Sequence, residues 1–460
     1  MQSYTLTDQE LLELEARYCS YGDTVHYSDK PVIFEQCEGS WLFDTQGKPY
    51  LDMQMWYSAV NFGYRNKDIE EAHNRQMATL PQVASQYLHK EKILLATAIS
   101  KETEKRFGDK GRVHFNVGGA QAVEDSLKLV RNYKKGKSLM FAFMGGYHGR
   151  TLAATEITSS FRYRKRYGHF GNRATFVPFP YCFRCFYEKK RETCDYECIK
   201  QFKKLFETEY YGVIDAKDKD VEYAAFYAEP VQATGGYIIP PPEYFKRLAE
   251  ILKKHNILLV DDEIQMGFYR TGKLWAMEHF GVSPDVIAFA KSLTNGMNPL
   301  SGLWAREELI NPKIFPPGCT HSTFSSNPLG TAAGLATMEL IQKNDYESIV
   351  NEKGAYLLEA LRGLQKRYPV IGDVDALGLA VRIELTKSDG FTPDRDLTDA
   401  IFQAGLNEDI EVDGKRYGLV LDVGGYYKNA FTLAPALTIS YDELDLFVRL
   451  FELLLNKCAA

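Results

Sequence analysis

The sequence has little cysteine, no excess of basic residues and no long apolar run. Its 8 cysteines in 460 residues are too few for a disulfide framework of this size. A formal net charge of −6 gives no basic footprint of the kind that nucleic-acid-binding proteins carry. No stretch is long enough to span a bilayer, and the N-terminus lacks the basic start and apolar core of a signal peptide. These absences predict a cytoplasmic protein with neither a nucleic-acid nor a membrane partner.

The residues that are present have the balance of an ordinary soluble globular protein, with 45% hydrophobic and 25% charged residues. From about Arg112, short apolar runs such as 139–143, 224–228 and 258–260 alternate with stretches of helical periodicity. Strands that alternate with helices form βαβ units, in which helices cover both faces of a parallel sheet. The sequence therefore predicts an α/β fold with a mostly parallel sheet.

The pattern also predicts how the chain divides, because 460 residues usually form more than one domain. After about residue 327 the alternation gives way to an apolar helix and then to strand-like and amphipathic stretches. We therefore expect a large domain over 61–326 and a smaller α+β domain over 327–460. The segment 1–60 is expected to pack with the small domain, and a cysteine-rich insertion at 180–200 to interrupt the large one.

Two reactive groups follow two of the apolar runs. Asp262 ends the run that begins at Leu258, and Lys291 follows the run 286–290. Ligands of open α/β sheets bind at the carboxyl ends of the strands. An aspartate buried beside a heterocyclic nitrogen would keep that nitrogen protonated, and a partly buried lysine could form a Schiff base. Taken singly, Asp262 as a helix cap and Lys291 as a surface lysine are the simpler interpretations.

Two further segments add a candidate phosphate-binding site and a candidate ring-stacking aromatic to this acid and amine. Gly118, Gly119 and Ala120 lie between a predicted strand and a helix, where free N–H groups and the helix dipole favour a phosphate. Tyr147 follows two glycines at a strand end, so its ring could lie against a flat ligand. A tight turn and a core aromatic are the simpler alternatives. Together, a phosphate cradle, an aromatic face, an acid and an amine are the parts that a pyridoxal phosphate site needs.

Longer motifs resemble those of class III aminotransferases, which are pyridoxal phosphate enzymes of fold type I. The segment 262–276 reads Asp-Glu-Ile-Gln-Met-Gly-Phe-Tyr-Arg-Thr-Gly-Lys-Leu-Trp-Ala and closely resembles that family's signature. Residues 278–285 and Lys291 continue it in register, and 147–151, 229–232 and 323–328 also match. The resemblance extends from residue 39 to about 440. It implies a sheet of the seven-stranded type in the large domain, with a smaller α+β domain beside it.

The resemblance also implies a role for each matching position. Lys291 would form a Schiff base with the cofactor and then shuttle a proton, and Asp262 would pair with the ring nitrogen. The other implied cofactor contacts are Gly119 and Ala120 at the phosphate, Tyr147 over the ring, Gln265 at the ring hydroxyl, and His148 and Glu229 nearby. Thr323 would reach the phosphate across the interface of a homodimer. The implied reaction is ping-pong amino transfer; a racemase or epimerase, or a non-enzymatic binding protein, are the alternatives.

Three positions bear on the substrate. Many family members carry a glutamate where this chain has Thr234, and a carboxylate-binding arginine where it has Thr432. Losing that arginine removes a bidentate contact with a substrate carboxylate. Trp56 lies in a segment that resembles the version found in ω-amine transaminases. We therefore expect an amine or ω-amino donor and a keto or aldehyde acceptor. The basic stretch 162–166 is interpreted as a solvated face or as a substitute for the lost arginine.

Half of the cysteines lie in the insertion. Cys182-x-x-Cys185 and Cys194-x-x-x-Cys198 have the pairwise spacing of zinc ligands, which predicts a tetrahedral structural zinc site. The interval between the two pairs is short for a common zinc ribbon. Reduced cysteines in a surface excursion, or a disulfide pair, are the alternatives. A similar Tyr-Cys-x-Arg-Cys element occurs in some members of the family outside the chemistry.

Overall fold

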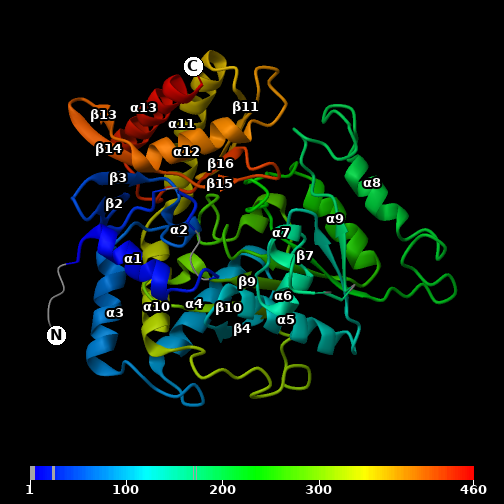
Figure 1. Ribbon diagram of the computed structural model, residues 1–460. Helices are drawn as coiled ribbons and strands as arrows, with labels where there is room; N and C mark the ends of the chain where they lie inside the picture. The colour runs from blue at the N-terminus through cyan, green and yellow to red at the C-terminus, as the bar shows by residue number, and fades with distance from the viewer. Residues whose placement is uncertain (1–5, 23–25, 29, 169, 172, 460) are drawn as a thin grey trace.

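The computed structural model describes residues 6–22, 26–28, 30–168, 170–171 and 173–459, around a central seven-stranded sheet (Figure 1). Its strands are β4 (Gly111–Asn116), β10 (Ser301–Arg306), β9 (Val286–Phe289), β8 (Leu258–Asp262), β7 (Tyr223–Ala228), β5 (Leu139–Phe143) and β6 (Ala174–Val177), in spatial order. Neighbours from β9 to β6 pair in parallel, and β10 is antiparallel to both β9 and β4. The sheet is therefore mixed but mostly parallel, and the predicted α/β class is confirmed.

Helices cover both faces of this sheet. Val123 and Val130 of α5 (Gly119–Tyr133) pack on one face with Met140, while Phe141 and Phe226 pack on the other. The second face is covered by α8 (Glu197–Lys204) and α9 (Tyr244–Lys254). Successive strand residues point to opposite faces, so a strand covered on both sides is apolar throughout. Full burial of each large apolar side chain contributes about 1.5–3 kcal/mol. Such strands therefore consist of apolar residues throughout, which is why these runs could be recognised as strands in the sequence.

The two ends of the chain share a second sheet. It contains, in order, β1 (Phe34–Glu38), β2 (Trp41–Asp44), β3 (Pro49–Asp52), β14 (Lys415–Val420) and β13 (Ile410–Val412). Strand β3 pairs in parallel with β14, where Tyr50 lies opposite Gly418. A Cβ atom at position 418 would collide with the Tyr50 ring, so only glycine permits this approach. The pairing joins the N-terminal segment to the C-terminal part, although the boundaries at 60 and 326 stay predictions.

The C-terminal part has a third sheet, which lies among several helices in the upper part of Figure 1. The sheet contains, in order, β11 (Ile371–Leu377), β12 (Ala380–Leu385), β16 (Ala430–Leu433) and β15 (Val423–Gly424). The remaining longer helices are α1 (Asp8–Tyr18), α3 (Lys67–Thr79), α4 (Lys90–Phe107), α10 (Pro328–Lys343), α11 (Tyr346–Arg367), α12 (Arg395–Asn407) and α13 (Tyr441–Cys458). Of these, α4 packs against β4 of the central sheet. Across the described part of the chain, no helix is both long and apolar enough to cross a bilayer.

The strand directions bring the predicted site residues to one edge. Strands β4, β5, β7, β8 and β9 all run the same way, so their carboxyl ends lie along the same side of the sheet. The residues at or just after these ends are Gly118, Tyr147, Glu229, Asp262 and Lys291. This edge of an open α/β sheet is where ligands bind. The fold thus assembles groups that lie up to 173 residues apart, from 118 to 291, in the sequence.

Candidate active site

Lys291 lies where β9 opens into the short 3-10 helix η2 (Lys291–Thr294), with its backbone at a left-handed φ of 45°. Such a conformation is costly for a non-glycine residue and is typical of functional sites. Its Nζ donates a hydrogen bond to Gln265 Oε1 at 2.5 Å. Burial lowers the pKa of Lys291 to about 8, against the opposing charges of Asp262, Glu229 and Asp422. At neutral pH, about a tenth of this amine is therefore unprotonated and nucleophilic.

A buried cluster of three ionisable side chains lies beside Lys291. Asp262 Oδ2 is 2.7 Å from His148 Nδ1, and both side chains are buried. Burial opposes a charge on His148, but the hydrogen bond and charge of Asp262 and the charge of Glu229 raise its pKa overall. The carboxylate of Glu229 accepts hydrogen bonds from the backbone N–H groups of Tyr147, at 2.9 Å, and Ala233, at 3.0 Å. Burial raises the pKa of Glu229 to about 7. The cluster fixes the orientation of the Asp262 carboxylate.

A cavity of about 650 Å³ joins these groups to the start of α5. Gly119 and Ala120 line it, and no side chain caps the helix N-terminus at Gly118. The first N–H groups of a helix have no partner within the helix and attract anions, above all phosphate. A Cβ atom on Gly119 would lie 3.0 Å from Ile264 Cδ1, so the helix start approaches the strand end closely because this residue is glycine. An uncapped helix start, a carboxylate and an amine on one cavity fit pyridoxal phosphate.

The other predicted cofactor residues line the same cavity. Tyr147 is partly buried there, and its ring meets the Tyr163 ring edge to face at 5.0 Å. Gln265 lies between Lys291 and Tyr237, since its Nε2 donates to the Tyr237 hydroxyl at 3.0 Å. Trp56 is 57% exposed and also lines the cavity. The structure thus brings together every predicted cofactor residue except Thr323, which is exposed and lines neither this cavity nor the larger one of its own chain.

Trp56 belongs to a single left-handed turn, α2 (Met55–Ser58). The four residues have φ values of 45°, 53°, 56° and 65°. Left-handed helical geometry costs about 1–2 kcal/mol for each residue other than glycine. Asp52 supports the turn, because its Oδ1 accepts hydrogen bonds from the N–H groups of Gln54 and Met55, each at 2.8 Å. Strain of this kind persists only where the surrounding structure enforces it, and it concentrates at functional sites.

Arg270, from the family-like motif, ties this turn to the rest of the molecule. It is fully buried, and the sequence offered no role for it. Its guanidinium donates to Ser58 Oγ at 2.9 Å, Asn61 Oδ1 at 2.6 Å and the carbonyl oxygens of Leu379 at 3.2 Å and Pro435 at 2.7 Å. Its planar fork of five donors suits several fixed acceptors at once. One side chain therefore links the turn to segments from the C-terminal part.

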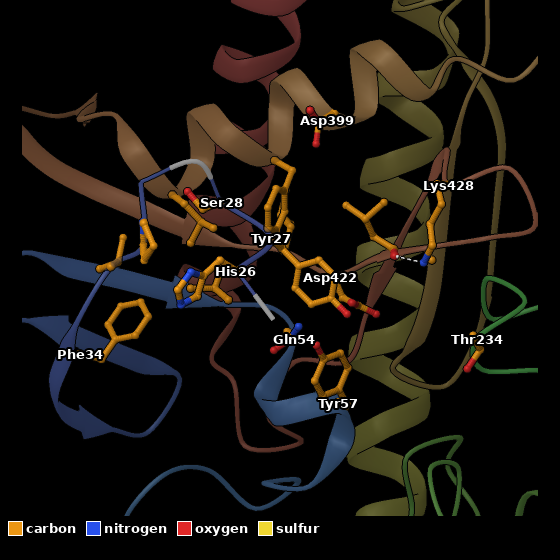
Figure 2. A pocket seen from close by; sticks show the side chains of 18 of the residues that line it. His26, Tyr27, Ser28, Phe34, Gln54, Tyr57, Thr234, Asp399, Asp422 and Lys428 are labelled. Carbon is orange, nitrogen blue, oxygen red and sulfur yellow. Dashed lines mark hydrogen bonds between the residues drawn. The ribbon is translucent and has the colours of Figure 1, made fainter. Parts of the chain in front are cut away.

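A larger cavity of about 1110 Å³ opens beside the first, and Gln265 lines both (Figure 2). Thr234 lines the larger cavity and is partly buried. Thr432 is buried and does not line it; its hydroxyl instead donates to Asp422 Oδ2 at 2.5 Å, and Asp422 lines the cavity. Sequence reasoning found the altered position but missed this carboxylate. A signal in the sequence could have identified Asp422, because it is an acidic residue close to the end of a strand. It follows β14, in the same way that Asp262 lies at the end of β8.

The basic stretch 162–166 divides between two environments. Arg162 and Lys165 line the larger cavity. Arg164, the last residue of α7 (Phe161–Arg164), lies over the rings of Phe170 and Phe176 at 5.8 and 5.3 Å. Cation–π contacts of this kind hold a guanidinium against the protein surface. The stretch is therefore only partly a solvated face.

The four cysteines of the insertion line one small cavity of about 30 Å³. They are Cys182, Cys185, Cys194 and Cys198, and all are free thiols. The described residues contain no group of three or more potential ligands arranged to hold a metal ion. Burial raises the pKa of Cys182 to about 11 and that of Cys198 to about 12. The zinc and disulfide predictions gain no support, and the structure favours reduced cysteines.

Comparison with known proteins agrees with this geometry. The family model for class III aminotransferases matches residues 24–455. A leucine/methionine racemase of Thermococcus litoralis is 31% identical over 441 residues, covering 95% of this chain and 93% of that protein. A taurine–pyruvate aminotransferase of Bilophila wadsworthia is 30% identical, covering 96% of each. An aminotransferase of Bacillus anthracis of known crystal structure matches with a TM-score of 0.85 at 27% identity, covering 98% of both chains. The chain therefore belongs to the class III aminotransferase family, with the fold type I architecture that its motifs predicted.

Proposed function

We propose that this enzyme binds pyridoxal phosphate in the cavity around Lys291 and transfers an amino group from an amine or ω-amino donor to a keto or aldehyde acceptor. When bound, the cofactor supplies an electron sink and carries the amino group between the two substrates. The observation that carries the proposal is the meeting of the Lys291 amine, the buried Asp262 carboxylate and the uncapped α5 start on one cavity. These are the groups that the cofactor's aldehyde, ring nitrogen and phosphate require.

Each of these residues has a defined task in the proposal. The backbone N–H groups of Gly119 and Ala120 bind the phosphate at the helix start. Asp262, which His148 orients, would pair its negative charge with the ring nitrogen of the bound cofactor and so favour the protonated ring. With a pKa of about 8, Lys291 Nζ can take a proton from the donor carbon that bears the amino group, and can return it.

The remaining polar groups position the cofactor. Tyr147 is proposed to cover the ring, with its backbone N–H anchored on Glu229. Gln265, held by Tyr237, presents its amide beside Lys291, where the ring hydroxyl would lie. The Glu229 carboxylate lies near both His148 and Asp262, since the charge of each acts on its pKa. Together these contacts fix the ring before any substrate enters, which is the proximity contribution to catalysis.

The donor is proposed to lack a carboxylate on the reacting carbon. Thr432 cannot supply the two parallel N–H donors with which an arginine binds a carboxylate. Thr234, which lines the cavity, is no substitute, because a hydroxyl carries no charge. The test is a panel of amines, ω-amino acids and α-amino acids, each paired with pyruvate or 2-oxoglutarate. If α-amino acids are the best donors and simple amines are inert, the proposed donor class is wrong.

The catalytic role of Lys291 has a direct test. Lys291→Ala should abolish both turnover and the visible absorption that the bound cofactor owes to this amine. Lys273→Ala, which breaks an ion pair with Glu347 away from the cavity, serves as the control. Persistent turnover in the Lys291→Ala variant would show that the proposed chemistry does not use this residue.

The active enzyme is proposed to be a homodimer in which Thr323 binds the phosphate of the partner subunit. Thr323 is exposed, and the adjacent Phe324 is 70% exposed, which favours a surface that a second copy covers. Light scattering should give twice the chain mass. Mixing inactive Lys291→Ala chains with Thr323→Ala chains should form some dimers with one site whose Lys291 and Thr323 are both intact. A fully active monomer would contradict this arrangement.

Racemisation is a second candidate, because two relatives are named as racemases, the leucine/methionine enzyme and an alanine/serine racemase of Pyrococcus horikoshii that is 29% identical. A racemase moves a proton at the amino-bearing carbon but leaves the amino group in place. One experiment separates the two reactions. An aminotransferase forms one equivalent of carbonyl product per site without any acceptor, whereas a racemase inverts an amino acid and forms none.

A further inference from the structure

We propose that Asp422 binds a second, positively charged group of the amino donor, so that diamines and similar dications are preferred over simple monoamines. This inference deepens the proposed function and rests on it. It concerns binding alone, because the reacting amine still meets the groups around Lys291. Asp422 follows β14, lines the larger cavity and is partly buried there (Figure 2).

The Asp422 carboxylate has few partners of its own. Its Oδ2 accepts a hydrogen bond from the Thr432 hydroxyl. Burial raises the pKa of Asp422 overall, while this bond, the charges of Lys428 and Lys291 and the side chain of Gln54 lower it. Among the residues that the structure describes, no lysine, arginine or histidine lies within 4.0 Å of it as an ion pair. A partly desolvated carboxylate with only neutral hydrogen-bond partners favours an incoming cation.

Lys428, from the same loop, lowers the pKa of Asp422 through its charge but forms no ion pair with it. Lys428 Nζ donates to the carbonyl oxygen of Val423 at 2.9 Å, and Figure 2 shows this bond beside Asp422. Burial lowers the pKa of Lys428, and the charge of Asp422 raises it. The ammonium is thus held by a backbone oxygen at the cavity wall. A substrate ammonium that reaches Asp422 therefore meets a carboxylate that forms no ion pair with any residue that the structure describes.

The charge at this position is opposite to the one that the family motif supplies. The motif places an arginine at position 432, whereas here the Thr432 hydroxyl donates to a carboxylate. A substrate carboxylate placed beside Asp422 would be repelled there, although Arg162, Lys165, Arg395 and Lys428 line other parts of the cavity. A substrate ammonium would be attracted, and the charge of Asp422 also acts on Lys291, which places it near the reacting end of the cavity. The loss of the arginine and the presence of the aspartate therefore favour the same substrate class.

The wall around Asp422 suits the carbon chain of such a donor. Tyr57, from the left-handed turn, lines the cavity, and Figure 2 shows its ring on the same side as Asp422 and Gln54. The charge of Asp422 and burial both raise the pKa of Tyr57, so its hydroxyl stays neutral. An aromatic face beside a carboxylate accepts the methylene groups and the ammonium of one ligand together.

The test compares matched donors in single-turnover reactions of the holoenzyme without an acceptor, followed by the visible absorption of the bound cofactor. The probes are 1-aminobutane, 1-aminopentane and the corresponding terminal diamines. We expect the wild-type rate constant at subsaturating donor to be about tenfold or more higher for a diamine than for its monoamine. Asp422→Asn should reduce that ratio to near one, mainly by slowing the diamine, while Asp422→Glu should retain part of the preference.

Asp399→Asn is the control, because Asp399 is an exposed carboxylate at the same cavity on α12, separate from Asp422 in Figure 2. It should leave the ratio unchanged. Equal wild-type rates for diamines and monoamines would overturn the inference while leaving the proposed function intact, and this comparison needs no variant to fold. An unchanged ratio in a folded Asp422→Asn enzyme would also overturn it. If no amine reacts and α-amino acids do, the proposed function and the inference fall together.

Discussion

Replacing Arg270 with methionine tests whether this one side chain holds the strained turn at the site. The four residues of α2 carry about 4–8 kcal/mol of left-handed strain between them. Arg270 opposes its release by bonding Ser58 within the turn and Asn61 just after it. In the variant we expect the turn to relax and to displace Trp56 from the cofactor cavity.

The magnitude follows from two opposing effects on the guanidinium. Burial lowers the pKa of Arg270 to about 10 from 12.5, and this corresponds to roughly 3 kcal/mol of desolvation cost. Its hydrogen bonds reach four acceptors, and each bond from a charged donor contributes about 1.5–3 kcal/mol. Even at the lower limit the bonds outweigh the cost by about 3 kcal/mol. Arg270→Met should therefore destabilise the protein by about 3 kcal/mol, reduced by whatever strain the relaxing turn releases.

Two measurements on the holoenzyme check this expectation. Urea unfolding gives the change in stability, and hydrogen exchange of residues 52–61 reports on the turn itself. Arg449→Met is the matched control, because Arg449 forms an exposed ion pair with Asp413 and such pairs contribute about 0–1 kcal/mol. The reasoning fails if Arg270→Met unfolds at the wild-type urea concentration with unchanged exchange in the turn. Desolvation would then cancel the hydrogen bonds, as replacing buried ionic groups by apolar ones sometimes shows.

Three further outcomes can be measured. The rate at which apoenzyme captures pyridoxal phosphate should rise with pH and level off above about 8, because the neutral amine of Lys291 reacts; a rise that continues toward pH 10 would contradict the lowered pKa. Gly149→Ala should weaken cofactor binding about tenfold or more, since its Cβ would lie 2.6 Å from Ala120 Cβ, whereas Gly136→Ala, also at positive φ but in open space, should not. Metal analysis of protein purified without chelator should find no stoichiometric zinc; one zinc per chain would show that the cysteine cavity binds metal after all.

The parts of the fold that were predictable are those in which local sequence and tertiary position agree. The runs 139–143 and 258–260 are apolar because both faces of their strands are covered, so they could be recognised without knowledge of their neighbours. The antiparallel direction of β10 could not be predicted from the sequence, because strand direction depends on which partners a strand finds in space. The left-handed turn at Met55 was equally hidden, since no glycine marks it and distant contacts with Arg270 enforce it.

The same division explains why the two halves of the site differ in how well the sequence predicts them. The cofactor half uses strand ends and one helix start, so short motifs around Gly119, Asp262 and Lys291 locate it. The substrate half is a wall built from Gln54 after β3, Thr234 after β7 and Asp422 after β14, which meet only in the folded chain. Replacing Asp422 alters no motif residue, although its charge acts on the pKa of Lys291. If the proposal holds, substrate choice changes at one wall position while the residues proposed to hold the cofactor stay the same, and the diamine comparison tests this.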